Sequence, residues 1–146
     1  MLSYRTFVAA ALAFAVGACG TASSETPNSS KPAHCIAAFN YGRQLALAGP
    51  SPKLSLAVQS TARALFEGKQ MEANGTFATG EKEGAALLKD HGHDPDIMMP
   101  LLLECSKRQD ADPAYRAMND NGQLMAAARK TDPACRSDAA CLNATK

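Results

Sequence analysis

Apolar residues recur at steps of three and four through most of the chain after residue 32, which is the period of a helix with one buried face. The first such stretch, 33–48, ends at a Gly–Pro pair. In the second stretch, Ser51 reads as an N-cap and Pro52 as the first helical residue, and the pattern stops within 68–75. Its expected stripe is Leu54, Val58, Thr61, Ala62, Leu65 and Phe66.

A third helix is predicted from Thr79, which can act as an N-cap, to Gly92, which can end a helix. A later helix carries Tyr115, Gly122 and Ala128 on one side. No segment shows the alternation of apolar and polar residues that is typical of strands. We therefore expect an all-α domain, a small bundle of about five helices.

Three Asp–Pro pairs divide the C-terminal half into short helices. Each pair combines a capping carboxylate with a proline at the first helical position. The capping residues are Asp94, Asp112 and Asp132. Pro100 lies inside the apolar run 97–103, so this segment is expected either to kink or to begin its regular helix at Pro100.

The first eighteen residues differ from the rest and have the parts of an export signal. Arg5 precedes an apolar run of about ten residues, too short to cross a hydrocarbon layer of roughly 30 Å. The run ends in small residues before Cys19, which resembles the lipobox of bacterial lipoproteins. That resemblance implies cleavage after Ala18 and attachment of acyl chains to Cys19, which together anchor a protein firmly. The alternative is an ordinary secretory signal, cut after Ala18 or Ala22.

Residues 19–32 follow as a polar stretch with almost no apolar content, which reads as a flexible tether. The expected organisation is a signal peptide at 1–18, a lipidated Cys19 with its tether at 19–32, and a single helical domain at 33–146. In the lipoprotein sorting rule, Asp after the lipidated cysteine retains the protein at the inner membrane, whereas this chain has Gly20. The resemblance thus implies an outer-membrane anchor facing the periplasm, where the cell has an outer membrane.

Removing Cys19 from the five cysteines leaves an even number, Cys35, Cys105, Cys135 and Cys141, in a compartment that oxidises thiols. Three connectivities are possible. We favour Cys35 with Cys105 and Cys135 with Cys141, the second of which requires a turn around Ser137 and Asp138. A zinc site is the weaker alternative, because the chain has no C-x-x-C pair.

Composition narrows the function classes. The net charge of the whole chain is +1 and both signs are interspersed without a basic tract, so a nucleic-acid partner is not expected. Aromatic residues make up only 5% and Trp is absent, which indicates a thin core that a disulfide would help to stabilise. No cofactor is expected.

The richest local set of side chains lies at 90–99. His91, His93, Met98 and Met99 offer imidazole and thioether groups, which are ligands for copper. The competing interpretation is that the two Met fill an apolar helix face and the His flank a solvated turn. No G-x-S-x-G elbow or other nucleophile set is present, so we do not expect an enzyme.

The layout of Cys35, Phe39, Pro100, Cys105 and Tyr115 resembles the small all-α periplasmic acid-stress chaperones of the HdeA type. In that family one disulfide ties the first helix to a later one. The chain departs from it in its anchor, its longer loop between cysteines and its second cysteine pair. The leading expectation is a membrane-anchored, non-catalytic binding module with an envelope protein as partner. An HdeA-like chaperone or inhibitor and a copper-binding envelope protein are the alternatives.

Overall fold

The computed structural model describes residues 26–144, and every regular element in that range is a helix. The helices are α2 (Pro32–Leu47), α3 (Leu54–Ala73), α4 (Phe77–His91), α5 (Pro95–Ala111), α6 (Pro113–Asp120), α7 (Gln123–Thr131), α8 (Pro133–Arg136) and α9 (Ala139–Leu142). The expected all-α class is confirmed. The expected number of about five helices is too low. The signal peptide at 1–18 and the lipidation site Cys19 lie outside the described residues.

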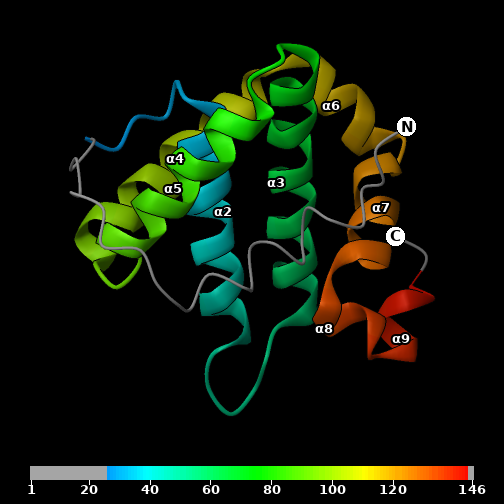
Figure 1. Cartoon of the computed structure of the whole chain (residues 1–146). Helices are drawn as coiled ribbons and strands as arrows, with labels where there is room; N and C mark the ends of the chain where they lie inside the picture. Colours follow the sequence, from blue (N-terminus) through cyan, green and yellow to red (C-terminus); the bar gives the residue numbers. More distant parts are fainter. Residues whose placement is uncertain (1–25, 145–146) are drawn as a thin grey trace.

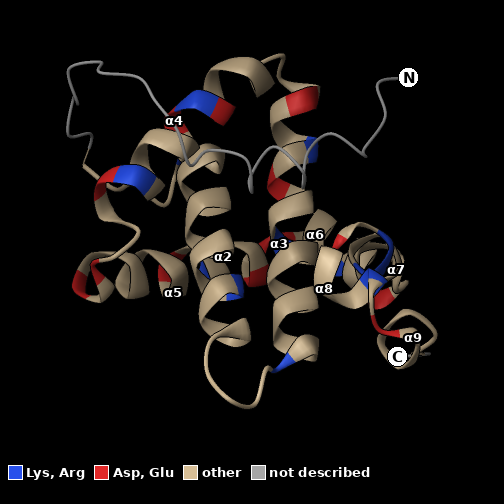
Figure 2. Ribbon diagram, turned by 60° about the horizontal axis from the view of Figure 1, so that its bottom comes forward, with Lys and Arg blue, Asp and Glu red and all other residues tan. Residues whose placement is uncertain are grey.

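Two long helices, α2 and α3, stand side by side in the middle of the molecule (Figure 1). α4 and α5 pack against α2 on one side of this pair, whereas α7 packs against α3 on the other. None of the helices within residues 26–144 is long and apolar enough to cross a membrane. In the view of Figure 2, acidic and basic residues are interspersed along the described helices.

The buried apolar side chains form two groups. We call the first group, between α2, α3, α4 and α5, the first core cluster; it includes Phe39, Met71, Leu87, Met98 and Leu101. The second core cluster lies between α3 and the C-terminal helices and includes Val58, Leu65, Phe66, Tyr115 and Leu124. α3 supplies side chains to both clusters and therefore lies between them.

The third helix begins earlier than expected. It starts at Phe77, not after Thr79, and Thr76 at its N-terminal boundary makes no side-chain cap. Gly75 adopts φ +68°, which turns the chain back so that Phe77 packs against the first core cluster. At Gly84 the helix lies so close to α2 that a Cβ there would come within 2.9 Å of the Ala33 carbonyl oxygen.

The second helix also begins at a different residue than predicted. Lys53 occupies the N-cap position of α3, so Ser51 and Pro52 belong to the preceding loop. The Lys53 amide donates to the Ala46 carbonyl at 2.7 Å, which ties the loop back to the end of α2. With the loop held in this way, α3 begins at Leu54, after the Ser51–Pro52 pair at which the sequence predicted its start.

All three Asp–Pro pairs begin helices, as predicted. The side chains of Asp94, Asp112 and Asp132 accept hydrogen bonds from the amides two residues further along, at 3.0, 2.8 and 2.9 Å. Of the two alternatives for Pro100, a kink or a helix start, the helix start is wrong, because α5 runs from Pro95 through an exposed Pro100 to Ala111.

The difference in helix number arises at the C-terminal end. The helix expected to continue through Gly122 is divided there, because Gly122 adopts the left-handed conformation with φ +69°. The division lets both Tyr115 of α6 and Leu124 of α7 reach the second core cluster. Two further short helices, α8 and α9, follow Asp132.

Candidate functional site

The structure pairs the four described cysteines in the connectivity that the sequence favoured. Cys35 joins Cys105 between α2 and α5, with 5.5 Å between their Cα atoms, and Cys135 joins Cys141 between α8 and α9, with 5.3 Å. The second disulfide closes over the expected turn, where the Asp138 side chain accepts a hydrogen bond from the Cys141 amide at 2.8 Å. Both bridges are structural elements of the helical core.

The four candidate copper ligands are distributed over different environments. His91 is the last residue of α4 and half-buried, while His93 is exposed in the following turn. Met98 is fully buried in the first core cluster, whereas its neighbour Met99 is 37% exposed. Among the described residues no group of three or more His, Cys, Asp and Glu is placed to hold a metal ion.

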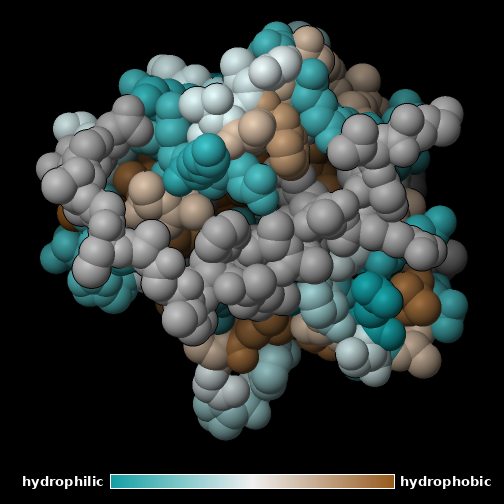
Figure 3. Space-filling model, in the orientation of Figure 1, coloured by the Kyte–Doolittle hydropathy of each residue, from teal (hydrophilic) through white to brown (hydrophobic). Residues whose placement is uncertain are grey.

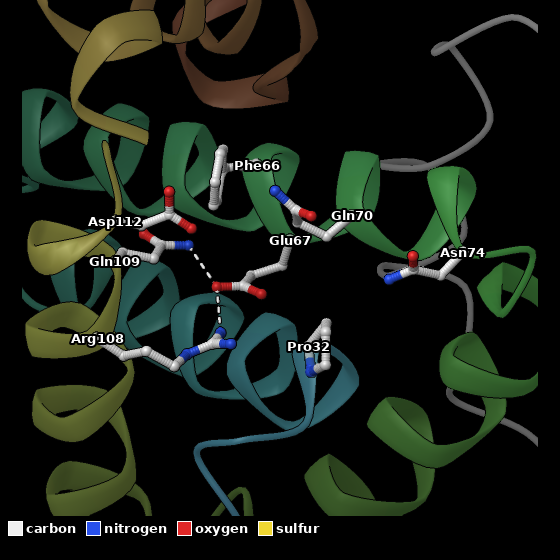
Figure 4. Close-up of a pocket in the computed structure, with 8 residues that line it drawn as sticks. All are labelled: Pro32, Phe66, Glu67, Gln70, Asn74, Arg108, Gln109 and Asp112. Atoms are coloured by element: carbon white, nitrogen blue, oxygen red, sulfur yellow. Dashed lines mark hydrogen bonds and ion pairs between the residues drawn. The ribbon is translucent and has the colours of Figure 1, made fainter. Parts of the chain in front are cut away.

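A hollow of roughly 210 Å³ lies where the start of α2 meets the second half of α3 and the end of α5 (Figure 4). Most of its lining side chains are polar, in contrast to the core clusters beside it. The lining residues are Pro32, Phe66, Glu67, Gln70, Asn74, Arg108, Gln109 and Asp112.

Glu67 is the most unusual residue of the hollow, because its charged side chain is only 1% exposed. One carboxylate oxygen, Oε1, accepts from Arg108 Nη2 at 2.5 Å and from Gln109 Nε2 at 2.7 Å. A buried carboxylate is costly unless a charge and several hydrogen bonds compensate it. Arg108 and Gln109 supply that compensation to one oxygen only.

The other carboxylate oxygen, Glu67 Oε2, is buried and has no hydrogen-bond partner among the described residues; Arg108 Nε is in the same state. In Figure 4 this second oxygen turns away from Gln109, toward the side of the hollow where Pro32 and Asn74 lie. An unpaired buried polar group costs about 1–3 kcal/mol, and more when it is charged. Two lining residues of the hollow thus each carry a buried polar atom, one acceptor and one donor, without a partner among the described residues.

Neighbouring contacts hold the two partners of Glu67 in place. Gln109 also donates to the Arg63 carbonyl at 2.9 Å, and Arg63 pairs with Asp110 at 2.8 Å. Arg108 Nη2 lies 3.3 Å from the Cys35 sulfur, so the site adjoins the long disulfide. These contacts fix the orientation of the carboxylate before any ligand is present.

Arg63 also connects the two core clusters. Its guanidinium lies over the ring of Tyr115 at 5.1 Å from the centroid and over that of Phe39 at 6.0 Å. Burial raises the pKa of the Tyr115 hydroxyl, and Asp110 adds to this rise, while Arg63 opposes it. The hydroxyl therefore stays protonated over the physiological range.

A second buried carboxylate, Asp132, is fully satisfied. It accepts from Arg43 at 2.6 and 3.0 Å and from Thr61 at 2.6 Å, and it also caps α8. Burial acts to raise the pKa of Asp132, but the hydrogen bonds from Arg43 and Thr61 outweigh it and hold the pKa below its usual range. Because both carboxylate oxygens already accept hydrogen bonds from the fold, Asp132 stabilises the domain and is not a candidate binding group.

Sequence reasoning did not single out Glu67, Arg108 or Gln109. A signal for Glu67 was present, because Ala64, Glu67 and Met71 follow one another at steps of three and four. All three are buried, so they form a second stripe on a helix for which only one stripe was expected. Arg108 and Gln109 carried no comparable signal, since their role depends on α5 lying across from α3.

The fold and the site together define a disulfide-linked all-α domain with a small polar hollow around a buried carboxylate. No protein-family model, no curated protein and no solved structure matches the chain significantly.

Proposed function

We propose that the chain is a lipid-anchored, non-catalytic binding module of the bacterial envelope, which holds its ligand in the hollow around Glu67. The unpaired Glu67 Oε2 carries the binding part of this proposal, because an incompletely bonded buried charge lowers stability and a bound donor would remove that cost. Protein sites that bind ligands commonly accept such a loss of stability.

The anchoring part rests on the N-terminal sequence. The apolar run and the small residues before Cys19 resemble a lipobox, and the polar stretch between Cys19 and the start of α2 suits a tether. Two disulfides in a short chain support folding in an oxidising compartment. Hydrophobic residues also form separate patches on the face drawn in Figure 3, which is compatible with contact to an envelope component.

Cys19→Ala tests the anchor in cells fed a clickable palmitate analogue. We expect the wild-type chain to incorporate the label and to sediment with membranes, whereas Cys19→Ala loses the label and leaves the membrane fraction. Gly20→Ala is the matched control, because it leaves the cysteine and the residues before it intact and should behave as wild type. An unlabelled wild-type chain would refute the lipid anchor.

Site-specific photo-crosslinking tests the binding function in intact cells. A crosslinker at Gln70, on the wall of the hollow, should give an adduct with an envelope component, whereas one at Glu72, exposed on the same helix, should not. Glu67→Gln should reduce the Gln70 adduct. Equal adducts from both positions, unaffected by Glu67→Gln, would show that the hollow is not the binding site.

A chaperone of the HdeA type is the second candidate, favoured by the disulfide that ties the first described helix to a later one. Such a protein should suppress aggregation of acid-stressed client proteins in a light-scattering assay. Unchanged client aggregation at every pH would exclude this candidate and leave the binding module.

A further inference from the structure

We infer that the hollow around Glu67 binds a primary ammonium group. This inference rests on the proposed binding function and names its ligand class. A carboxylate oxygen can only accept hydrogen bonds, so the group that satisfies Glu67 Oε2 must be a donor. An ammonium supplies three N–H donors at a single point, which suits a buried oxygen in a small hollow.

The charges around the hollow favour a cation over a neutral donor. Glu67 and Asp112 supply two carboxylates, and Arg108 is the only cationic side chain among the described residues that line the hollow. The lining thus keeps an excess of one negative charge. A single ammonium balances it, whereas an anion would have no uncompensated positive group to meet.

The rest of the hollow, away from the Glu67 carboxylate, restricts which groups the ammonium can be attached to. Phe66 and Pro32 give the hollow apolar surface for a few methylene groups. Its volume of roughly 210 Å³ is about seven times the volume that one water occupies in the liquid, which suits a small amine or one side chain. Arg108 Nε is a second unpaired group and donates, so an oxygen on the ligand can accept from it. Two sources fit this chemistry: a free small amine, including an amino alcohol, and the side chain of a lysine on a protein partner.

Titration of the full-length chain, purified in dodecyl maltoside and in phosphate buffer free of amines, tests the ammonium directly. Amide NMR shifts or calorimetry should show saturable binding of ethylammonium chloride. Tetramethylammonium chloride at equal ionic strength has the same charge without N–H donors and should not bind. An equal response to both salts, or to neither, would overturn the inference.

Glu67→Gln removes the charge and converts one carboxylate oxygen into an amide donor. It should weaken ethylammonium binding about tenfold to a hundredfold, the usual value of one charged hydrogen bond. Glu72→Gln removes the same charge from an exposed position of the same helix and should leave the affinity unchanged. Equal affinity of Glu67→Gln and wild type would contradict the site.

A second variant keeps the test valid if Glu67→Gln folds poorly. Gln70→Lys places an ammonium one helical turn from Glu67, on the wall of the hollow. It should abolish ethylammonium binding and raise the melting temperature, because the internal ammonium takes the place of the ligand. Gln59→Lys, the same change at an exposed position of α3, should do neither. Undiminished binding in Gln70→Lys would overturn the inference.

The source of the ammonium follows from two further probes. Ethanolamine should bind more tightly than ethylammonium if a free amino alcohol is the ligand, because its hydroxyl can accept from Arg108 Nε. Nα-acetyl-lysine methylamide should bind at least as tightly as ethylammonium if a lysine side chain is the ligand. Binding of neither probe would contradict an ammonium site.

The failure of this inference differs from the failure of the proposed function. Loss of acyl label or of the envelope adduct with intact ethylammonium binding would refute the anchored module and leave the ammonium site. A labelled, membrane-bound chain that forms the Gln70 adduct but ignores ethylammonium would keep the module and refute the ligand class.

Discussion

The two core clusters are held together by different means. In the first core cluster, long helices are tied by the Cys35–Cys105 disulfide, which spans 70 residues of sequence. In the second, short helices carry a disulfide that spans only 6 residues, and a buried ion pair from Arg43 to Asp132 fastens them to the rest. Short helices gain little from their own hydrogen bonds, so they depend on such long-range contacts.

The two buried carboxylates beside these clusters extend the comparison. Both oxygens of Asp132 accept hydrogen bonds beside the second core cluster, whereas one oxygen of Glu67, beside the first, has no partner within residues 26–144. Both are almost inaccessible to solvent. Burial alone therefore does not separate a stabilising carboxylate from a candidate binding group; the number of satisfied acceptor positions does.

Removal of the long disulfide should give the largest effect. Replacing Cys35 and Cys105 together by Ala should lower the free energy of unfolding by about 4 kcal/mol, because the loop that the bridge closes in the unfolded chain is long. Urea denaturation followed by circular dichroism, without reductant, measures it. A loss no larger than that from removing the short disulfide would refute the asymmetry between the clusters.

Asp132→Ala should have the next largest effect. It leaves the Arg43 guanidinium, 11% exposed, without its partner and removes the cap of α8, at a cost of about 3 kcal/mol. Asp94→Ala removes a cap without a buried ion pair and should cost about 1 kcal/mol. Equal losses in the two variants would show that the ion pair contributes nothing beyond the cap.

The short disulfide should matter less, and more locally. Replacing Cys135 and Cys141 by Ala should lower the free energy of unfolding by about 2 kcal/mol, since the closed loop is short. Hydrogen exchange should accelerate in 133–142 and stay slow in α2 and α3. Faster exchange across α2 as well would mean that the short bridge supports both clusters.

The smallest expected effect is the contribution of Asp132 to the loss of folding stability at low pH. Because its pKa is lowered from the ordinary value of 3.8, its contribution to stability is complete above that pH and is lost as the pH falls through the folded pKa. Asp132→Asn should remove this part of the slope when unfolding is compared between about pH 6 and about pH 3. An unchanged slope in Asp132→Asn would place the acid sensitivity elsewhere.

The helix starts that the sequence predicted correctly are those set by hydrogen bonds between residues close together in the sequence. The Asp–Pro pairs begin helices because the capping carboxylate and the amides it serves are two or three residues apart. The Ser51–Pro52 and Thr79 signals failed, because the contacts that decide those helix starts, from Lys53 to α2 and from Phe77 to the first core cluster, are not local. Because only one apolar stripe was expected on α3, its second buried face was not predicted.

The all-α class, an even set of four cysteines after Cys19 and the capped starts of three helices could be read from the sequence, and they follow from periodicity, from the cysteine count and from side chains that bond to their own neighbours. Three disulfide connectivities stayed possible, and the tertiary structure decided among them. Only the tertiary structure shows that Glu67 is buried against Arg108 and Gln109 and that, in the part of the chain it describes, one of the carboxylate oxygens has no partner. Those partners lie more than 40 residues away, so their contact depends on how α5 crosses α3 and not on any local pattern.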